Sequence, residues 1–450
     1  MHGFIIAGTN SGCGKTTVTI GLMALLQSKG MLVAPFKTGP DYIDPAFHRR
    51  VTGVPSYNLD SFLLNDQSLQ HLFYKHSAGS DIAVVEGVMG MYDGLGKEGS
   101  GSTWEMAQKL NLPIVLVVNC KGLYQSVIAI IKGFAELKNP SKVNGVILNH
   151  VSSKMQFDFL QSLIEEETGI ACIGYLPTRE EIGLESRHLG LIQADEVDTL
   201  PKKVALLRQT MEETIDVPAL LKATEIEQPS PTPIELPDLD LSDLQIGVAH
   251  DKAFSFYYQD NLELLEKLGA TLHYFSPLND RSLPAACNCL YLGGGYPEVF
   301  TAELLQNTAL MQEIKLKIES GMPVYAECGG LMYLTDSIIS LENEETPMCG
   351  VFNVSVQMTT RLQRFGYAQI SYANTVTPCH EFHRSQLVQK ESQKNYRETY
   401  QLRKPNRSVE WECGLQRKNC LAAYAHVHFY SKFEFLNAIC TLWKKATTSI

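Results

Sequence analysis

The chain has 450 residues, of which 44% are hydrophobic and 19% are charged, and its formal net charge is −11. This length exceeds what one ordinary core supports, so we expect two or three globular domains. The acidic balance disfavours a nucleic-acid partner, and no apolar run is long enough to span a bilayer. The 11 scattered cysteines contain no paired C-x-x-C set that would bind zinc. We therefore expect a cytoplasmic protein without nucleic-acid or membrane partners, in a compartment that keeps thiols reduced.

The first predicted elements are a buried strand at residues 4–7 and a helix at 16–28, joined by the sequence GTNSGCGKTT at residues 8–17. This segment is typical of a phosphate-binding loop, although five residues rather than four separate its first glycine from Gly14. Glycines allow close backbone approach to an anion, and the amides at the start of the helix point at it. The alternative is a glycine-rich turn that binds nothing. The predicted ATP-binding residues are Gly12, Gly14, Lys15, Thr16 and Thr17, with Lys15 at the β- and γ-phosphates and Thr16 as a ligand of Mg²⁺.

Five further apolar and β-branched runs in the N-terminal half are typical of buried parallel strands. They lie at residues 31–36, 81–87, 113–119, 143–149 and 171–176, with helical patterns between most of them. This order predicts a doubly wound α/β domain over residues 1–224. Its phosphate loop resembles that of the dethiobiotin synthetases, G-T-x-x-G-x-G-K-T. Asn10 replaces the lysine of ParA-type ATPases, which disfavours a DNA-partitioning switch.

Acidic side chains follow two of these strands. Glu86 ends one strand within DIAVVEGVMGMYDG, and FKTGPDYIDP follows another. Carboxylates at the carboxyl ends of parallel strands are placed to hold the Mg²⁺ of a nucleotide, so Glu86 is predicted as a metal ligand beside Thr16. The alternatives are an exposed acid at a strand end and a Gly-Pro turn with capping acids. The other residues predicted for this site are Lys37, Asp41 and Asp44, because phosphoryl transfer needs charge neutralisation and metal positioning.

The composition changes at residues 225–243, where four prolines accompany several acids, and we expect an extended linker there. A second α/β series follows over residues 244–450. Its segment MPVYAECGGLMYL predicts a strand, a sharp turn at Cys328 and a helix, as at a nucleophile elbow. A helix N-terminus favours a thiolate, although most lone cysteines are small buried hydrophobes. The sequence AAYAHVHFY predicts His426 and His428 on one face of a late strand, as candidates for the base that the thiol needs.

Seven segments together resemble the family of cobyrinic acid a,c-diamide synthases: FKTGPDYIDP, EGVMGMYDG, ESRHLGL, AFSFYYQDN, FSPLND, GGGYPE and YAECGGLMYL. The resemblance implies an ATP-dependent, glutamine-hydrolysing amidotransferase of the corrin pathway. Such an enzyme takes cobyrinic acid, ATP and L-glutamine or ammonia, and uses Mg²⁺. The resemblance also implies that the ATP–Mg²⁺ and substrate site is lined by Asp41, Tyr42, Asp44, Glu86 and Asp93. The alternatives are an a,c-diamide synthase for another tetrapyrrole, such as nickel-sirohydrochlorin, and a nucleotide-dependent switch protein with an inactive glutaminase half.

The second half resembles the class I glutamine amidotransferase domain, in which a Cys–His–Glu triad ends in H-x-E. Here His428 takes the place of the carboxylate, which leaves open what orients His426, and His428 itself is one candidate. GGGYPE follows another predicted strand, and the predicted oxyanion-hole donors are the backbone amides of Gly294, Gly295 and Gly329. For the two histidines of HEFHRS, His380 and His383, we favour a structural or domain-contact role over a metal site.

The substrate implied by the resemblance is a polycarboxylate, whereas the chain is acidic, so we expect a local basic patch. The candidates are Arg49, Arg50, Arg187 and His188, and for each of them exposed surface charge is the alternative. The polar stretch at residues 388–406 predicts a surface loop or hairpin insertion.

Overall fold

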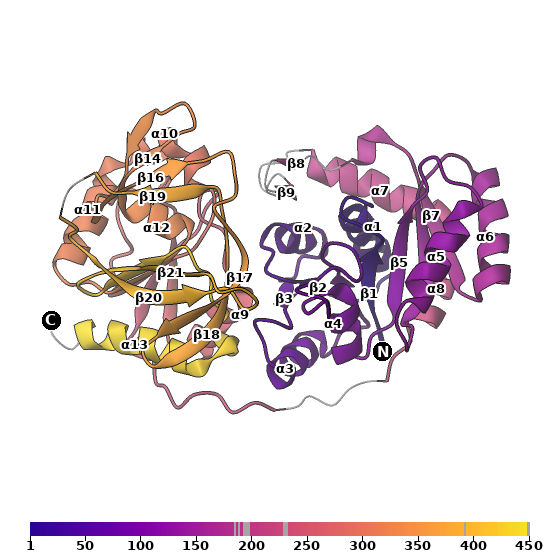
Figure 1. The fold of residues 1–450 in the computed structure, drawn as a ribbon, viewed down its shortest axis with the longest axis horizontal. Helices are drawn as coiled ribbons and strands as arrows, with labels where there is room; N and C mark the ends of the chain where they lie inside the picture. The colour runs from indigo at the N-terminus through magenta and orange to yellow at the C-terminus, as the bar shows by residue number, and fades with distance from the viewer. Residues whose placement is uncertain (184–185, 188–189, 192–198, 228–232, 391–392, 448–450) are drawn as a thin grey trace. The chain divides into compact units, whose positions relative to one another are not determined.

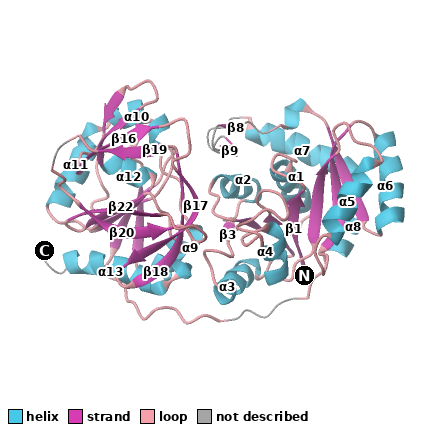
Figure 2. Cartoon of the chain, in the orientation of Figure 1, coloured by secondary structure: helices cyan, strands magenta, loops and turns pink. Residues whose placement is uncertain are grey.

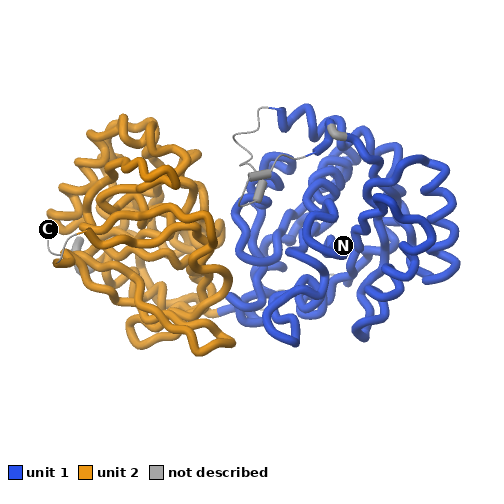
Figure 3. The backbone as a smooth tube through the Cα atoms, turned by 45° about the horizontal axis from the view of Figure 1, so that its top comes forward, with its two compact units in different colours: residues 1–234 blue, residues 235–450 orange. Residues whose placement is uncertain are grey.

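The computed structural model describes residues 1–183, 186–187, 190–191, 199–227, 233–390 and 393–447, and Figure 1 shows its helices and strands in chain order. The chain forms two compact units, Met1–Ile234 and Glu235–Ile450 (Figure 3). The boundary between them falls inside the proline-rich stretch that the sequence predicts as a linker. No helix among the described residues has the length and apolar content needed to cross a membrane.

Unit 1 is built on a seven-stranded sheet in the order β3-β2-β4-β1-β5-β6-β7, in which every neighbouring pair is parallel. The strands are β1 (His2–Gly8), β2 (Val33–Thr38), β3 (Tyr57–Leu59), β4 (Ile82–Glu86), β5 (Ile114–Asn119), β6 (Val143–Val151) and β7 (Ala171–Pro177). The helices that flank this sheet (Figure 2) are α1 (Lys15–Ser28), α2 (Ile43–Thr52), α3 (Asp66–Ser77), α4 (Thr103–Lys109), α5 (Ser126–Glu136), α6 (Lys154–Thr168), α7 (Leu200–Thr214) and α8 (Val217–Ala223). A short pair, β8 (Ser186–Arg187) and β9 (Gly190–Leu191), stands apart from the sheet.

The core of unit 1 explains why its strands are continuous apolar runs. Phe4 and Ile6 of β1 are fully buried in one cluster with Val84 of β4, Val115 of β5 and Leu22 of α1. Strands covered by helices on both faces have no exposed side and so do not alternate with polar residues. Because β1 lies between β4 and β5, the chain changes direction across the sheet at β1, and ligands of doubly wound sheets bind at the carboxyl edge of such a switch point. The predicted doubly wound α/β fold is confirmed.

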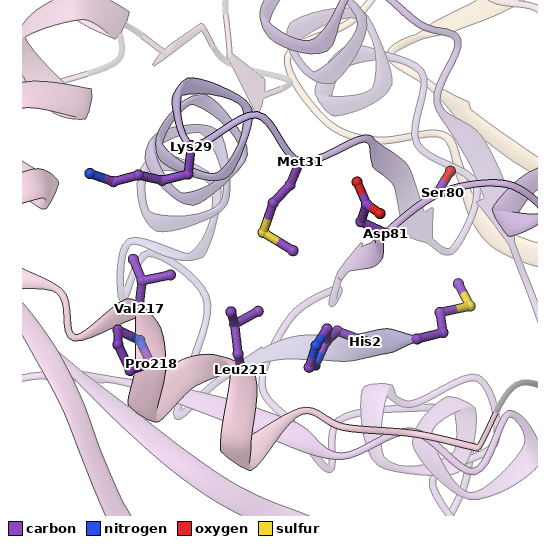
Figure 4. Close-up of a pocket in the computed structure, with 9 residues that line it drawn as sticks. His2, Lys29, Met31, Ser80, Asp81, Val217, Pro218 and Leu221 are labelled. Carbon is purple, nitrogen blue, oxygen red and sulfur yellow. The ribbon is translucent and has the colours of Figure 1, made fainter.

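A pocket of about 880 Å³ opens at the opposite edge of this sheet (Figure 4). Its lining includes His2 at the start of β1, Met31 shortly before β2 and Asp81 immediately before β4. Asp81 accepts a hydrogen bond from the backbone N–H of Leu32 at 2.7 Å, which closes the turn into β2. Because the phosphate loop follows the carboxyl end of β1, this pocket is not the predicted nucleotide site.

Unit 2 contains a nine-stranded sheet in the order β11-β10-β12-β13-β22-β21-β20-β17-β18. Its first five strands are parallel: β11 (Thr271–Phe275), β10 (Gln245–Ala249), β12 (Cys289–Leu292), β13 (Val324–Glu327) and β22 (Cys420–Ala423). The rest pair antiparallel: β21 (Glu410–Arg417), β20 (Arg397–Arg403), β17 (Arg364–Tyr372) and β18 (Thr375–His383). A second sheet holds β15 (Glu345–Pro347), β14 (Thr335–Ile339), β16 (Phe352–Met358) and β19 (Ser385–Val388). The helices are α9 (Gln259–Lys267), α10 (Thr301–Gln306), α11 (Thr308–Glu319), α12 (Gly329–Leu334) and α13 (Phe433–Thr447).

The stretch at residues 388–406, predicted as a surface loop or hairpin insertion, contains strand β20, which forms a hairpin with β21; this hairpin is part of the nine-stranded sheet and not a surface insertion. β20 pairs with β17 and β21 inside the nine-stranded sheet. Its Tyr400 and Leu402 are buried, while Gln401 and Arg403 between and after them are exposed. A strand with one face in the core alternates in this way, and the polar residues of the other face concealed it in the sequence.

Candidate active site

The phosphate loop runs from the end of β1 to the start of α1. Gly12 and Gly14 have φ angles of 78° and 100°, in the left-handed region that glycine enters without steric cost. Gly14 also lacks room for a side chain, because a Cβ there would lie 2.0 Å from Nδ2 of Asn149. Asn149, near the end of β6, donates to the carbonyl of Cys13 at 2.9 Å and so holds the loop. Thr17 is half-buried in the first turn of α1.

Lys15 begins α1 and folds its side chain back over the loop. Its Nζ donates to the carbonyl of Met89 at 2.5 Å and to that of Asn10 at 3.4 Å. Burial lowers the pKa of Lys15. The segment after β4 closes over the same loop, since the N–H of Met91 donates to the carbonyl of Gly8 at 2.8 Å. A cationic group is therefore held beside the helix N-terminus, where the amides of α1 already favour an anion.

Glu86 is the centre of a buried polar network at the end of β4. Its Oε1 accepts from Oγ1 of Thr16 at 2.6 Å and from Nζ of Lys37 at 3.0 Å. Its Oε2 lies 2.8 Å from Nε2 of His48. Lys37 also donates to Asp44 at 2.5 Å. The fold thus brings together Thr16, Lys37, Asp44 and Glu86, which the sequence singles out in three separate segments.

The charges of this network stabilise one another. Burial alone would raise the pKa of Glu86, but Lys37 and the hydrogen bond from His48 outweigh burial and hold that pKa below its ordinary value. Burial alone would lower the pKa of Lys37, but the carboxylates of Asp44 and Glu86 raise it above its ordinary value. His48 is fully buried, and its Nδ1 lies 3.0 Å from Oγ of Ser56. Sequence reasoning missed His48, although it lies one helical turn after Asp44 on the same face of α2.

The oxygen donors around Glu86 fit a magnesium ion. Mg²⁺ takes oxygen ligands and is usually held by one or two protein groups together with phosphates. The Thr16 hydroxyl and the Glu86 carboxylate lie 2.6 Å apart. A carboxylate has about four acceptor positions, and Thr16, Lys37 and His48 use three of them in Glu86. Thr16 and Glu86 are therefore the residues that would hold the ion.

Asp41 and Tyr42 lie immediately before α2, at the edge of the Glu86 network. Oδ1 of Asp41 accepts from two backbone N–H groups at the start of α2, at 2.8 and 3.1 Å. Its Oδ2 lies 4.0 Å from Nζ of Lys37. Asp41 thus caps the helix, as the alternative interpretation of its motif expects, and its second oxygen also faces the network.

Asp93 lies in the loop after β4. It accepts from the N–H of Gly90 at 3.0 Å, and a Cβ on Gly90 would lie 3.2 Å from the carbonyl of Thr9. This places the Asp93 loop beside the phosphate loop. Asp93 therefore holds a loop that lies beside the phosphate loop, and it has no described bond to the Glu86 carboxylate.

The structure describes only some of the basic residues that were predicted to contact the substrate. Arg49 and Arg50 lie in the last turn of α2 and are exposed. His188 lies outside the described residues. Arg187 is described only as backbone of the short strand β8.

Cys328 occupies the turn between β13 and α12, and the predicted strand, turn and helix are confirmed. Its φ of 47° and ψ of −100° lie in a region that residues with a side chain rarely adopt. Such strain is expected at a nucleophile elbow. Its backbone N–H donates to the carbonyl of Ala423 at 2.7 Å, which anchors the turn to β22.

The thiol of Cys328 is buried, which disfavours its ionised form. Burial raises its pKa, the carboxyl of Glu298 raises it further, and the N–H of Gly329 opposes the rise. Burial thus acts against the effect that is expected from the helix N-terminus. The thiol therefore needs a base at the moment of reaction.

The prediction that His426 and His428 lie on a strand is wrong, because β22 ends at Ala423. His426 instead forms an isolated backbone bridge with His380, with N–H···O distances of 2.9 and 3.2 Å. The two rings stack with their centroids 4.9 Å apart. A spacing of two residues is typical of a strand face, but here it belongs to a segment beyond the end of β22 that contacts β18 by a single bridge.

The two histidines have different carboxylate neighbours. Nδ1 of His426 lies 3.4 Å from Oε2 of Glu327. Nε2 of His428 lies 3.8 Å from Oδ2 of Asp260, and its ring lies 4.7 Å from that of Tyr258. Sequence reasoning missed Glu327, the residue immediately before Cys328. That His428 orients His426 stays a prediction.

Gly294, Gly295 and Gly329 lie together beside the nucleophile elbow. A Cβ on Gly329 would lie 3.0 Å from the nitrogen of Gly295, and a Cβ on Gly294 would lie 2.5 Å from Cε1 of His426. The N–H of Gly294 donates to the carbonyl of Phe256 at 3.2 Å. The Gly294 N–H is therefore already hydrogen-bonded within the protein and is not available to an oxyanion. The amides of Gly295 and Gly329 stay as predicted oxyanion-hole donors.

The HEFHRS motif makes structural contacts at the end of β18. Nδ1 of His383 lies 2.8 Å from the carbonyl of Ser385. The His383 ring stacks on that of Tyr424 with centroids 3.8 Å apart. Together with the bridge from His380, these contacts tie β18 to the segment that carries His426, which agrees with the structural role favoured from the sequence.

Glu381, between these histidines, should make stability depend on pH. Burial raises its pKa to about 7, against the opposing charges of Lys404 and Arg364. A glutamate in the unfolded chain ionises near pH ~4.3, so between about pH 4 and 7 only the unfolded state loses this proton, and stability falls as pH rises. Glu381→Gln removes that loss, which is roughly 3 kcal/mol.

The measurement for Glu381→Gln is the denaturation midpoint of the variant and of the unchanged protein at pH 5 and pH 8. The stability difference should grow in favour of the variant at pH 8. Glu410→Gln, which changes an exposed acid on β21, is the control and should show no such growth. A difference of equal size at both pH values would contradict the prediction.

The fold and the two sites together define a class of protein. One unit carries a phosphate loop with a buried acidic network, and the other carries a cysteine elbow beside a histidine, as in ligases that join a nucleotide-binding domain to a glutamine amidotransferase domain. The sequence model of the CobQ/CobB/MinD/ParA nucleotide binding domain matches residues 4–192. That of the CobB/CobQ-like glutamine amidotransferase domain matches residues 245–433.

Relatives cover nearly the whole chain. A cobyrinate a,c-diamide synthase from Caldanaerobacter subterraneus subsp. tengcongensis is 44% identical over 95% of this chain and 95% of its own. Enzymes of the same name from Clostridium tetani and Fusobacterium nucleatum are 41% and 39% identical over 98% of this chain, and over 99% and 100% of their own. The chain belongs to the family of cobyrinate a,c-diamide synthases.

Proposed function

We propose that this protein amidates the a and c carboxylates of cobyrinic acid, using ATP and ammonia released from L-glutamine. The observation that carries the proposal is the presence, in one chain, of the Glu86 network beside the phosphate loop and of the Cys328 elbow beside His426. Relatives named cobyrinate a,c-diamide synthase support the choice of substrate. We assign the synthetase reaction to residues 1–224 and the glutaminase reaction to residues 244–450.

The synthetase half activates a carboxylate, because its oxygen is too poor a leaving group to be displaced by ammonia. A carboxylate oxygen of the substrate attacks the γ-phosphorus of ATP, ADP leaves, and an acyl phosphate forms. Ammonia then attacks the acyl carbon, and phosphate leaves. Lys15 neutralises the phosphates, and Mg²⁺ held by Thr16 and Glu86 supplies further charge neutralisation when bound. The remaining residues of this site are Lys37, Asp41, Tyr42, Asp44 and Asp93.

The glutaminase half makes ammonia, which is scarce at neutral pH because most of it is ammonium. The sulfur of Cys328 attacks the side-chain amide carbon of glutamine, and His426 takes the thiol proton. The amides of Gly295 and Gly329 stabilise the oxyanion. His426 then gives the proton to the leaving ammonia, and water hydrolyses the thioester to glutamate.

The test is mass spectrometry of cobyrinic acid after incubation with the protein, ATP, Mg²⁺ and glutamine. We expect two successive replacements of a carboxyl OH by NH₂, and none when ATP or the nitrogen source is left out. Amidation of nickel-sirohydrochlorin without amidation of cobyrinic acid would overturn the substrate. Failure to release ammonia from glutamine would favour a nucleotide-dependent switch with an inactive glutaminase half. All 11 cysteines are free thiols, which supports our placing the reaction in the reducing cytoplasm.

A further inference from the structure

The two ring nitrogens of His426 face different surroundings. Nδ1 lies 3.4 Å from Oε2 of Glu327. On the other side of the ring, Nε2 lies close to Gly294: a Cβ added to Gly294 would lie 3.2 Å from it. Gly294 in turn lies close to Gly329, since a Cβ added to Gly329 would lie 3.3 Å from the carbonyl carbon of Gly294. Nε2 therefore faces the glycine loop next to Cys328, while Nδ1 faces a carboxylate.

Glu327 is held in one position by three donors. It ends β13 and is 1% exposed. Its Oε1 accepts from the Tyr325 hydroxyl at 2.8 Å and from the N–H of Val427 at 3.1 Å, and its Oε2 accepts from the Tyr291 hydroxyl at 3.2 Å. Burial, reinforced by Glu327, raises the pKa of both tyrosines, so they remain O–H donors. These bonds fix both oxygens of the carboxylate and leave Oε2 turned toward His426.

The strand pairing of unit 2 explains how Glu327 reaches the histidine. β13 pairs with β22 so that Glu327 lies opposite Ala423, and the N–H of the next residue, Cys328, bonds to the Ala423 carbonyl. The chain after β22 then runs past the end of β13, where the N–H of Val427 meets Glu327. Glu327 lies directly before the nucleophile elbow, and its side chain bonds to the segment that carries His426.

Unit 2 holds a second buried histidine beside a carboxylate, and it provides a comparison. Nε2 of His428 lies 3.8 Å from Oδ2 of Asp260, and both residues are at most 1% exposed. Of the two histidines, His426 is the one whose ring lies against the Gly294 loop. Of the two carboxylates, Glu327 is therefore the one beside the histidine that lies near the Cys328 elbow.

We propose that Glu327 is the positioning residue that orients His426, in place of the carboxylate expected at position 428. This proposal rests on the glutaminase half of the proposed function. Glu327 holds a proton on Nδ1 of His426 and so leaves Nε2 free to accept one. Nε2 takes the proton of Cys328 as the sulfur attacks glutamine, and passes it to the departing ammonia. Between these steps the imidazolium lies beside the Glu327 carboxylate, and contacts of this kind are often longer before the substrate binds.

The test compares Glu327→Gln with Asp260→Asn, which makes the same carboxylate-to-amide change at the other buried histidine. We expect Glu327→Gln to lower the glutaminase kcat by ~10²–10⁴-fold, because an amide N–H turned toward Nδ1 favours the wrong tautomer. The KM for glutamine should stay nearly unchanged, because Glu327 acts through His426 and not on glutamine. Asp260→Asn should keep a kcat close to that of the unchanged protein. The reverse order of the two variants, or a change confined to KM, would overturn the proposal.

The readouts separate this proposal from the proposed function. Glutamine hydrolysis is followed as glutamate released in the absence of any tetrapyrrole, so failure to amidate cobyrinic acid would overturn the substrate and leave this comparison intact. Thermal unfolding shows whether Glu327→Gln is folded. If Glu327→Gln does not fold, Glu327→Asp tests the proposal instead. It keeps the charge but moves the carboxylate away from Nδ1 of His426 by the length of one methylene. Its kcat should fall by ~10-fold or more at unchanged KM, and an unchanged kcat would overturn the proposal.

Discussion

Replacing Cys328 by serine should abolish amidation that depends on glutamine and leave amidation that depends on ammonia largely intact. Serine keeps the shape of the strained turn, but its hydroxyl needs stronger assistance from a base than a thiol does. The acyl phosphate forms at the phosphate loop and needs no thioester, so ammonia added from solution should still react with it. The assay is product formation at saturating ATP, with glutamine or with ammonium chloride at elevated pH.

The matched control for Cys328→Ser is Cys349→Ser. Cys349 is as deeply buried in unit 2, and burial raises the pKa of its thiol as well, but it does not lie at a strained turn. It should retain both activities. Equal loss of both activities in a folded Cys328→Ser protein would refute the separation of the two centres and would place Cys328 in the synthetase site or in the core.

The parts of the fold that the sequence predicts are those that short segments determine. The phosphate loop, its helix and the elbow at Cys328 each follow from residues that are neighbours in sequence, and the fully buried parallel strands leave continuous apolar runs. The antiparallel half of unit 2 does not, because its strands carry polar residues on one face and so leave no continuous apolar run. β20 is the clearest case, since its buried Tyr400 and Leu402 alternate with exposed polar residues.

The residues of the two sites are likewise predictable only where a short segment of sequence determines them. Thr16, Lys37, Asp44 and Glu86 were singled out because they end strands or begin helices, and parallel strands bring such positions to one edge. Asn149 acts on that edge through a tertiary contact that no local pattern predicts. His48 lies one helical turn after Asp44, but its bond to Glu86 is a contact between α2 and β4 that the helical spacing alone does not specify. Glu327 is not predictable for another reason: its chemistry depends on the path of the chain after β22, where the sequence predicts a strand that carries His426 and His428.

Replacing Lys15 by alanine should abolish amidation with either nitrogen source. Lys15 acts on the phosphates, and the acyl phosphate must form before glutamine-derived or added ammonia can react. The substitution removes a positive charge that is held beside the helix N-terminus by the carbonyls of Met89 and Asn10. We expect a fall in kcat of at least ~10³-fold, the scale seen when a preorganised donor to a transition-state charge is lost.

The control for this prediction lies immediately after the same helix. Lys29, at the other end of α1, is exposed and lines the pocket at the opposite edge of the sheet, so Lys29→Ala should retain both activities. Glutamate release measured without tetrapyrrole should survive in Lys15→Ala, because the glutaminase residues lie in the other unit. Cys328→Ser and Lys15→Ala then have opposite patterns: the first loses glutamine hydrolysis and keeps ammonia-dependent amidation, and the second keeps hydrolysis and loses all amidation. Near-normal turnover of Lys15→Ala with ammonium chloride would refute the role of Lys15, and the phosphate loop would then not be the site where the carboxylate is activated.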